Sequence, residues 1–161
     1  MMNFVANLFA RAEPSFSEAR SSDAAALAAL HGTCFHRGWS EDEFERLLTD
    51  RGVVTHRALI GRRLVGFIMS RMIEGEAEIL SVAVAAARRK RGLARQLLNL
   101  HMRCLAAFGT RTIFLEVDEE NVPARRLYQR AGFHAVGRRE GYYADRSGKS
   151  SAALVLRCEL P

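Results

Sequence analysis

The stretch from residue 79 to residue 108 constrains the fold of this chain most strongly. It opens with Ile79–Val84, a mostly apolar and partly β-branched run that is typical of a buried strand. It closes with 93–108, where leucines and other apolar residues recur at spacings of three and four, the pattern of one buried helix face. The sequence therefore predicts a strand, a short link and a long helix, with five cations at the link: Arg88, Arg89, Lys90, Arg91 and Arg95.

This basic link has the properties of a phosphate-binding loop. The first amides of a helix have no intrahelical acceptor, the helix dipole adds a positive field there, and Gly92 lets a ligand approach the backbone. A run of charges alone would instead favour a solvated turn before an ordinary amphipathic helix. The spacing favours the phosphate site, because residues 89–94 fit the pattern Arg/Gln-x-x-Gly-x-Gly/Ala.

Two motifs resemble the GNAT family of N-acetyltransferases. The hexapeptide 89–94 is similar to the loop on which that family holds the pyrophosphate of acetyl-CoA. Residues 121–133 match a second and more specific signature, Asn-x-x-Ala-x-x-Leu-Tyr-x-x-x-Gly-Phe. The resemblance implies the GNAT fold, an α+β (mixed α/β) architecture with a mostly antiparallel central sheet, splayed central strands and flanking helices.

The remaining periodicities predict the order β-α-α-β-β-β-α-β-α-β-β, which is similar to that of the family. Asp23 is expected to cap the first helix, and Ser40 with Glu43 forms a capping box for the second. Gly109 is expected to end the long helix. The expected strands are 16–20, 53–60, 64–71, 77–84, 112–117, 133–138 and 151–159, and the expected helices are 24–31, 40–48, 93–108 and 124–131.

Length and composition indicate one globular domain. The chain has 161 residues, which we divide into an N-terminal extension, 1–15, and a single domain, 16–161. No apolar run approaches a membrane span, so no membrane association is expected. The net charge of +6 favours anionic ligands. Three cysteines without metal-ligand spacing indicate a reduced, cytoplasmic protein with no metal, and the five histidines show no ligand pairing either.

Glu116 and Tyr128 are the candidate catalytic residues. Glu116 is the one charged residue in the apolar strand 112–117, where a carboxylate is costly unless it has a partner or belongs to a site. It could act as a general base, or the end of the strand could simply be solvated. Tyr128 could be core packing, although a buried tyrosine hydroxyl needs a partner. The resemblance implies that Glu116 accepts a proton and that Tyr128 protonates the departing thiolate.

Further residues resemble the RimI branch of the family, which acetylates the N-terminal alanine of a small-subunit ribosomal protein. They are Gly38-Trp39-Ser40, Leu115-Glu116-Val117 and Arg138-Arg139-x-x-Tyr142-Tyr143. The resemblance implies an acceptor site that includes Trp39, Tyr142 and Tyr143, although Trp39 could equally be a core residue. The implied acetyl-CoA contacts are Val82, Ala83, Val84, Arg89, Lys90, Arg91, Gly92, Leu93, Ala94, Arg95 and Asn121.

The expected reaction is direct acetyl transfer from acetyl-CoA to a protein N-terminal α-amine, without a metal. A ribosomal protein is the expected partner, and direct nucleic-acid binding is not expected, although the basic charge leaves it open. A lysine side chain, a small amine or an aminoacyl-tRNA are alternative acceptors. A non-catalytic acyl-CoA-binding domain is a further alternative, but such a domain needs neither Glu116 nor Tyr128.

Overall fold

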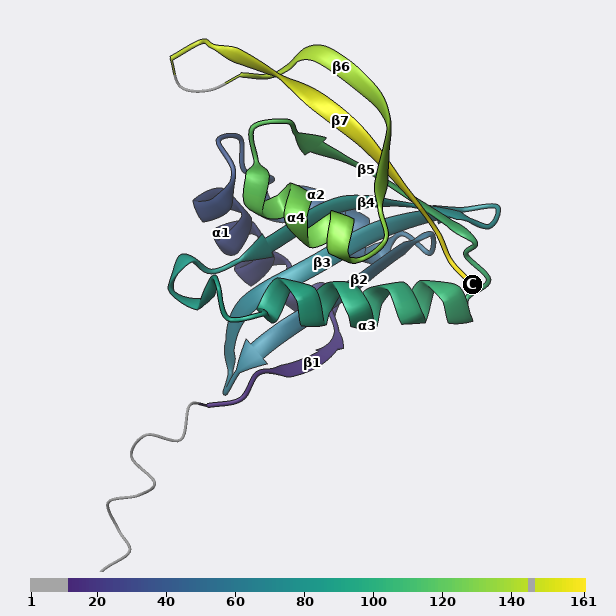
Figure 1. Ribbon diagram of the computed structural model, residues 1–161. Helices are drawn as coiled ribbons and strands as arrows, with labels where there is room; N and C mark the ends of the chain where they lie inside the picture. Colours follow the sequence, from purple (N-terminus) through teal and green to yellow (C-terminus); the bar gives the residue numbers. More distant parts are fainter. Residues whose placement is uncertain (1–11, 145–146) are drawn as a thin grey trace, which may run out of the picture.

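A mixed seven-stranded sheet organises the chain (Figure 1). The computed structural model describes residues 12–144 and 147–161, so most of the expected extension lies outside the described residues. The strand order is β1-β2-β3-β4-β5-β7-β6, and all neighbours are antiparallel except β4 and β5. The strands are β1 Ser15–Glu18, β2 Val53–Ile60, β3 Arg63–Ile73, β4 Glu76–Val84, β5 Thr112–Asp118, β6 His134–Ala144 and β7 Ser150–Glu159.

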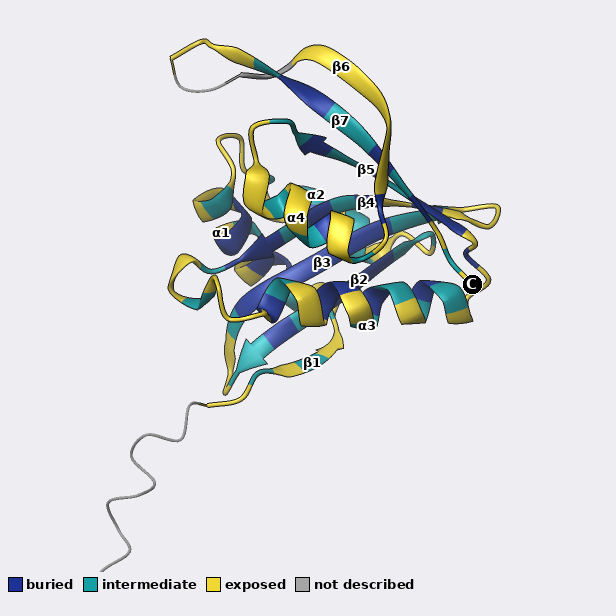
Figure 2. Cartoon of the chain, in the orientation of Figure 1, coloured by how far each residue is buried: buried dark blue, intermediate teal, exposed yellow. Residues whose placement is uncertain are grey.

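Helices cover both faces of this sheet. They are α1 Ala24–Cys34, α2 Glu41–Thr49, α3 Leu93–Ala107 and α4 Val122–Arg130. Residues of α3 and α4 share one apolar cluster with the sheet, while α1 and α2 share a second cluster on the other face. Figure 2 shows α3 with its sheet-facing side buried and its outer side exposed. None of the helices in the described ranges is long and apolar enough to cross a membrane. The predicted order of strands and helices is confirmed.

The helix ends follow the predicted signals with one exception. Ser40 and Glu43 form the predicted capping box of α2, and Gly109 adopts φ +91° just after α3. Asp23 is the N-cap residue of α1, as predicted, but its carboxylate makes no hydrogen bond to the first amides of the helix. That carboxylate instead accepts the N–H of Arg20 at 2.6 Å and pairs with Arg57 at 2.5 Å. A cation on the neighbouring strand therefore competes successfully with the helix for this carboxylate.

The two central strands separate at their carboxyl ends, as the resemblance implied. β4 pairs with β5 only from Glu76–Ile79, although β4 continues to Val84 and β5 to Asp118. A register shift against β3 leaves Leu80 without a Cα partner and bends β4 at this point. Beyond Ile79, the β5-facing backbone edge of β4 has no strand partner among the described residues.

The last hairpin is longer than the sequence predicted. β6 was expected to end at Arg138, before a polar loop, but it continues to Ala144 and pairs with β7 as far as Ser150. Since β6 is an edge strand of the sheet, its side chains can be charged and exposed without a desolvation cost.

Candidate functional site

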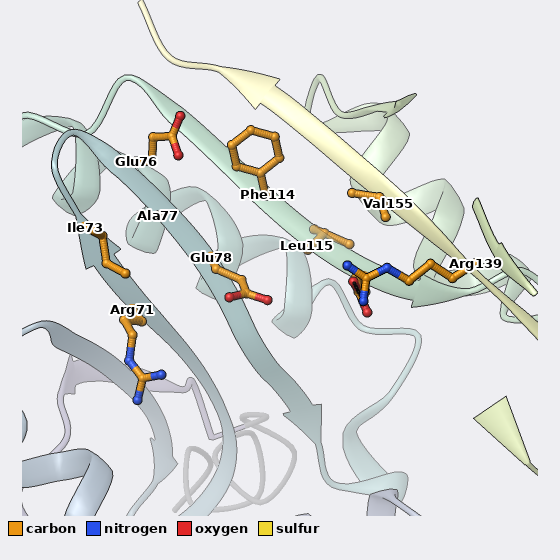
Figure 3. A pocket seen from close by; sticks show the side chains of 10 residues that line it. Arg71, Ile73, Glu76, Ala77, Glu78, Phe114, Leu115, Arg139 and Val155 are labelled. Carbon is orange, nitrogen blue, oxygen red and sulfur yellow. Dashed lines mark ion pairs between the residues drawn. The ribbon is translucent and has the colours of Figure 1, made fainter. Parts of the chain in front are cut away.

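A cavity of about 290 Å³ opens across β3, β4 and β5, close to where the central strands separate. Its apolar floor comes from Phe114 and Val155, and Arg139 reaches in from β6 (Figure 3). Three carboxylates and two guanidinium groups surround that floor. The complete lining is Arg71, Ile73, Glu76, Ala77, Glu78, Phe114, Leu115, Glu116, Arg139 and Val155.

Glu116 enters this cavity because side chains alternate along β5. Ile113, Leu115 and Val117 are buried in the cluster shared with α3 and α4, so Glu116 lies on the opposite face. Its side chain is 20% exposed, and its Oε1 lies 3.1 Å from Nη1 of Arg139. The carboxylate is therefore neither freely solvated nor unpaired, and it lies one residue beyond the last β4–β5 pair, Ile79 with Leu115.

Tyr128 and Asn121 both belong to α4, on the other face of the sheet from Glu116. Tyr128 is buried, and its ring meets Phe133 edge-on at 5.6 Å between centroids. The side chain of Asn121 accepts the N–H of Ala124 at 3.2 Å and caps α4. The sequence signature therefore fixes the start of α4 as well as the position of its tyrosine.

The basic loop has free capacity for an anion. Gly92 is the N-cap of α3 with φ +79° and has no side chain with which to cap it, and the first turn of the helix carries no carboxylate. Lys90, Arg91 and Arg95 are exposed around this end. Such a helix start attracts phosphate through its unsatisfied amides and its dipole.

Arg89 differs from the other cations of the loop because its side chain folds back onto β4. Its Nε donates to the carbonyl oxygen of Val84 at 3.2 Å, and its Nη2 lies 3.5 Å from Sγ of Cys34. The residues Val82, Ala83 and Val84 pair with β3 on one edge, and in the described structure their other edge faces no strand. An extended ligand can therefore hydrogen-bond to this edge as an added strand would.

Trp39 is half-buried in the connection between α1 and α2, where it is both a packing residue and the wall of a second cavity. His31 is buried, stacks on the Trp39 ring at 4.6 Å and accepts the Trp39 backbone N–H at Nδ1 over 3.0 Å. Burial lowers the pKa of His31 to about 4, although the carboxylate of Glu43 opposes the shift. The ring of His31 is therefore neutral and acts as a hydrogen-bond acceptor at neutral pH.

The second cavity has a volume of about 340 Å³ and lies between α2 and β3. It is lined by Trp39, Glu43, Arg46, Leu47, Asp50 and Arg71. The residues Tyr142 and Tyr143, which were predicted to contact the acceptor, belong to β6. Their side chains are not among the parts of the chain that the structure describes.

Sequence reasoning missed three residues that shape these cavities. Arg139 belongs to the motif 138–143, but the motif assigns it no role. No sequence pattern marks Arg71 or His31 as functional. Arg139 and Arg71 act through contacts with residues on other elements, and His31 acts through a contact with Trp39 in the connection after α1; no local pattern reveals these contacts.

Solved structures of other proteins share this fold. The ribosomal-protein-S18-alanine N-acetyltransferase of Escherichia coli superposes with a TM-score of 0.86 over 91% of this chain and 94% of that one, at 23% identity. The NAA60 protein of Arabidopsis thaliana bound to acetyl-CoA gives a TM-score of 0.81, at 22% identity over 92% of this chain and 99% of that one. At these identities the likeness establishes the fold alone.

Sequence relatives are named for N-terminal acetylation. The [ribosomal protein bS18]-alanine N-acetyltransferase of Haemophilus influenzae is 33% identical over 98 residues, 61% of this chain and 66% of that protein. An N-alpha-acetyltransferase of Saccharolobus solfataricus is 30% identical over 63% of this chain and 69% of that protein. The chain spans slightly less than two-thirds of the Haemophilus relatives that it matches, at 66% and 64% of their lengths.

The acetyltransferase (GNAT) family profile matches residues 24–133, which include the strand Glu76–Val84, the basic loop, β5 and α4. Since this match covers more than half of the sequence and includes both of its motifs, the chain belongs to the GNAT acetyltransferase family.

Proposed function

We propose that this chain is an N-acetyltransferase that moves the acetyl group of acetyl-CoA to a protein N-terminal α-amine. The observation that carries the proposal is the position of Glu116, a half-buried carboxylate in a cavity beside the unpaired end of β4. The relatives that are named for N-terminal acetylation support the same type of acceptor.

Acetyl-CoA fits two features of the backbone. Its pyrophosphate would bind the uncapped first amides of α3 and the side chains of Lys90, Arg91 and Arg95. Its pantetheine arm would pair with the free edge of Val82–Val84. This arrangement brings the thioester to the point where β4 and β5 separate, within reach of the cavity that holds Glu116. Arg89, whose side chain is held by Val84, would act by fixing this edge.

The reaction needs one general base, one general acid and a hydrogen-bond donor to the oxyanion. The nitrogen of the acceptor attacks the thioester carbonyl, and Glu116 takes the proton from that nitrogen directly or through water. A backbone N–H of the free β4 edge stabilises the oxyanion. As the C–S bond breaks, Tyr128 gives its proton to the thiolate. An α-amine has a pKa of about 8, against about 10.4 for lysine, so a single carboxylate is a sufficient base for the α-amine.

The ion pair with Arg139 has a defined part in this scheme. It holds the carboxylate of Glu116 inside the cavity while no amine is present. Because Arg139 is 60% exposed, its guanidinium can move aside when a cationic amine enters. The ammonium takes the place of the guanidinium beside the carboxylate and loses one proton to solvent to become the neutral nucleophile. The second proton then passes to Glu116 as the amide bond forms.

The proposed acceptor is the N-terminal alanine of a small-subunit ribosomal protein in the cytoplasm. The relatives from Haemophilus influenzae and Escherichia coli are named for this acceptor. Trp39 and the β6 segment that carries Tyr142 and Tyr143 would contact the acceptor.

The proposal is tested by the Glu116→Gln variant. We expect turnover of an α-amine peptide to fall by about 10²- to 10⁴-fold, the contribution of a general base, while calorimetry finds the affinity for acetyl-CoA nearly unchanged. Glu120→Gln, at an exposed position shortly after β5, is the matched control and should keep full turnover. An equal loss of turnover and acetyl-CoA affinity in Glu116→Gln would make Glu116 a structural residue and contradict the scheme.

A further inference from the structure

The two cavities share one residue, Arg71, which lines both of them. We propose that the second cavity binds a large apolar or aromatic side chain at the third or fourth residue of the acceptor peptide. This inference rests on the proposed function, because it places the acceptor amine at Glu116. It extends the acceptor site across the sheet to α2.

A straight path connects the two cavities across neighbouring strands. Phe114 of β5 lies opposite Glu78 of β4, which in turn lies opposite Arg71 of β3. Arg71 then reaches Asp50, just past the end of α2, at 3.8 Å. Figure 3 shows Glu78 and Arg71 side by side on adjacent strands with Phe114 beyond them.

The length of this path fixes which acceptor residues it can hold. Two strand spacings measure about 10 Å, and an extended peptide advances about 3.3 Å per residue. Glu116 lies two residues, or about 7 Å, further along β5 than Phe114, so about 12 Å separate Glu116 from Arg71. Three to four residues of an extended acceptor span this distance. The third or fourth residue is the first that can reach into the second cavity.

The second cavity offers an apolar contact because its carboxylates are already engaged. Glu43 accepts the N–H of Ser40 in the capping box, and Asp50 accepts the N–H of Gly52 and pairs with Arg71. The faces that remain for a ligand are those of Trp39 and Leu47, with Arg46 at their side. An aromatic ring fits this setting best, since it can stack on Trp39 and lie under a guanidinium group.

Trp39 is held in place before any acceptor arrives. His31 stacks on its ring and binds its backbone N–H, and the ring of Phe44 lies 5.5 Å away on another side. The capping box of Ser40 then fixes the next residue of the chain to α2. A preorganised aromatic wall binds a side chain without first losing the conformational freedom of a loop.

The test compares acceptor peptides that share an N-terminal alanine. One pair has six residues with phenylalanine or serine at the third and fourth positions, and a third acceptor is a dipeptide. We expect kcat/KM for the phenylalanine peptide to exceed that for the serine peptide by about tenfold, mainly through KM, with the dipeptide no better than the serine peptide.

A variant confirms the location. Leu47→Ser should make kcat/KM for the phenylalanine and serine peptides about equal. Glu45→Ser, on the exposed side of the same helix, should keep the difference in kcat/KM between the two peptides. Because the peptide comparison needs only the unaltered enzyme, a Leu47 variant that fails to fold leaves that result standing. Equal kcat/KM for all three acceptors overturns this subsite and leaves the proposed function intact. Acetylation of none of them overturns both.

Discussion

Mild acid is expected to destabilise this fold through buried histidines. His56 of β2 and His101 of α3 are buried, with their Nδ1 atoms 2.7 Å apart, and Nε2 of His101 lies 2.7 Å from Oγ of Ser70. With both rings neutral, one Nδ1–H donates to the other Nδ1 and every contact is satisfied. Burial and, to a smaller extent, the neighbouring His56 together lower the pKa of His101 to about 3. Burial also lowers the pKa of His56.

The size of the effect follows from proton linkage. The unfolded chain takes up protons near pH 6.5, whereas His101 and His31 in the fold have pKa values of about 3 and about 4. Between pH 6.5 and these lower pKa values, the unfolded state binds more protons than the folded state. The contribution of the neutral histidines to stability is therefore complete above pH 6.5 and is lost as the pH falls below it. At pH 5, each of these two histidines costs about 2 kcal/mol of unfolding free energy, or about 4 kcal/mol together. That is a large fraction of the 5–15 kcal/mol that is typical of a domain.

Urea unfolding at pH 7, 6 and 5 measures this loss, with the fluorescence of Trp39, the only tryptophan, as the probe. Replacing the whole polar group, His56→Leu with His101→Leu and Ser70→Ala, leaves no orphaned donor and should reduce the loss by about 2 kcal/mol. The control is His36→Gln, at an exposed position, which should leave the loss unchanged. An unfolding free energy that stays constant from pH 7 to pH 5 would refute the reasoning.

Four further substitutions test separate parts of the account. Gly92→Ala and Gly109→Ala introduce a side chain at positive φ at the two ends of α3, so each should cost about 1 kcal/mol of stability, but only Gly92→Ala should weaken acetyl-CoA binding in calorimetry. Equal affinities in the two variants would remove the basic loop from the site. Ser40→Ala should lower the unfolding free energy by about 1 kcal/mol through loss of the α2 cap, and an unchanged urea midpoint would contradict that cap. Tyr128→Phe should lower kcat with little change in acetyl-CoA affinity, and an unchanged kcat would exclude a proton from Tyr128.

The sequence predicted the fold well where local signals agree. The long helix α3 combines a clear apolar periodicity with Gly109 at its end, and α2 begins at a full capping box. Asp23 occupies the predicted N-cap position, but its carboxylate binds Arg57, 34 residues away, and makes no bond to the helix amides. The extent of β6 was underestimated because its pairing with β7, and not its own composition, makes it a strand.

The candidate site was predictable only in part. Glu116 stands out in the sequence because a single carboxylate interrupts an apolar strand, and the basic loop stands out through its spacing. The ion pair of Glu116 with Arg139 depends on β7 lying between β5 and β6, which is a property of the sheet order. The contact of His31 with Trp39 and the position of Arg71 between two cavities arise only when α1, α2 and β3 come together.

The most direct test of the proposed function is the intact mass of two peptides after incubation with the protein and acetyl-CoA. One peptide has the N-terminal sequence of the ribosomal protein with a free N-terminal alanine, and the other has the same sequence with a blocked N-terminus and free lysines. The account predicts a gain of one acetyl group on the first peptide alone. Acetylation of the blocked peptide, or of neither peptide while acetyl-CoA still binds, would contradict transfer to a protein N-terminal α-amine.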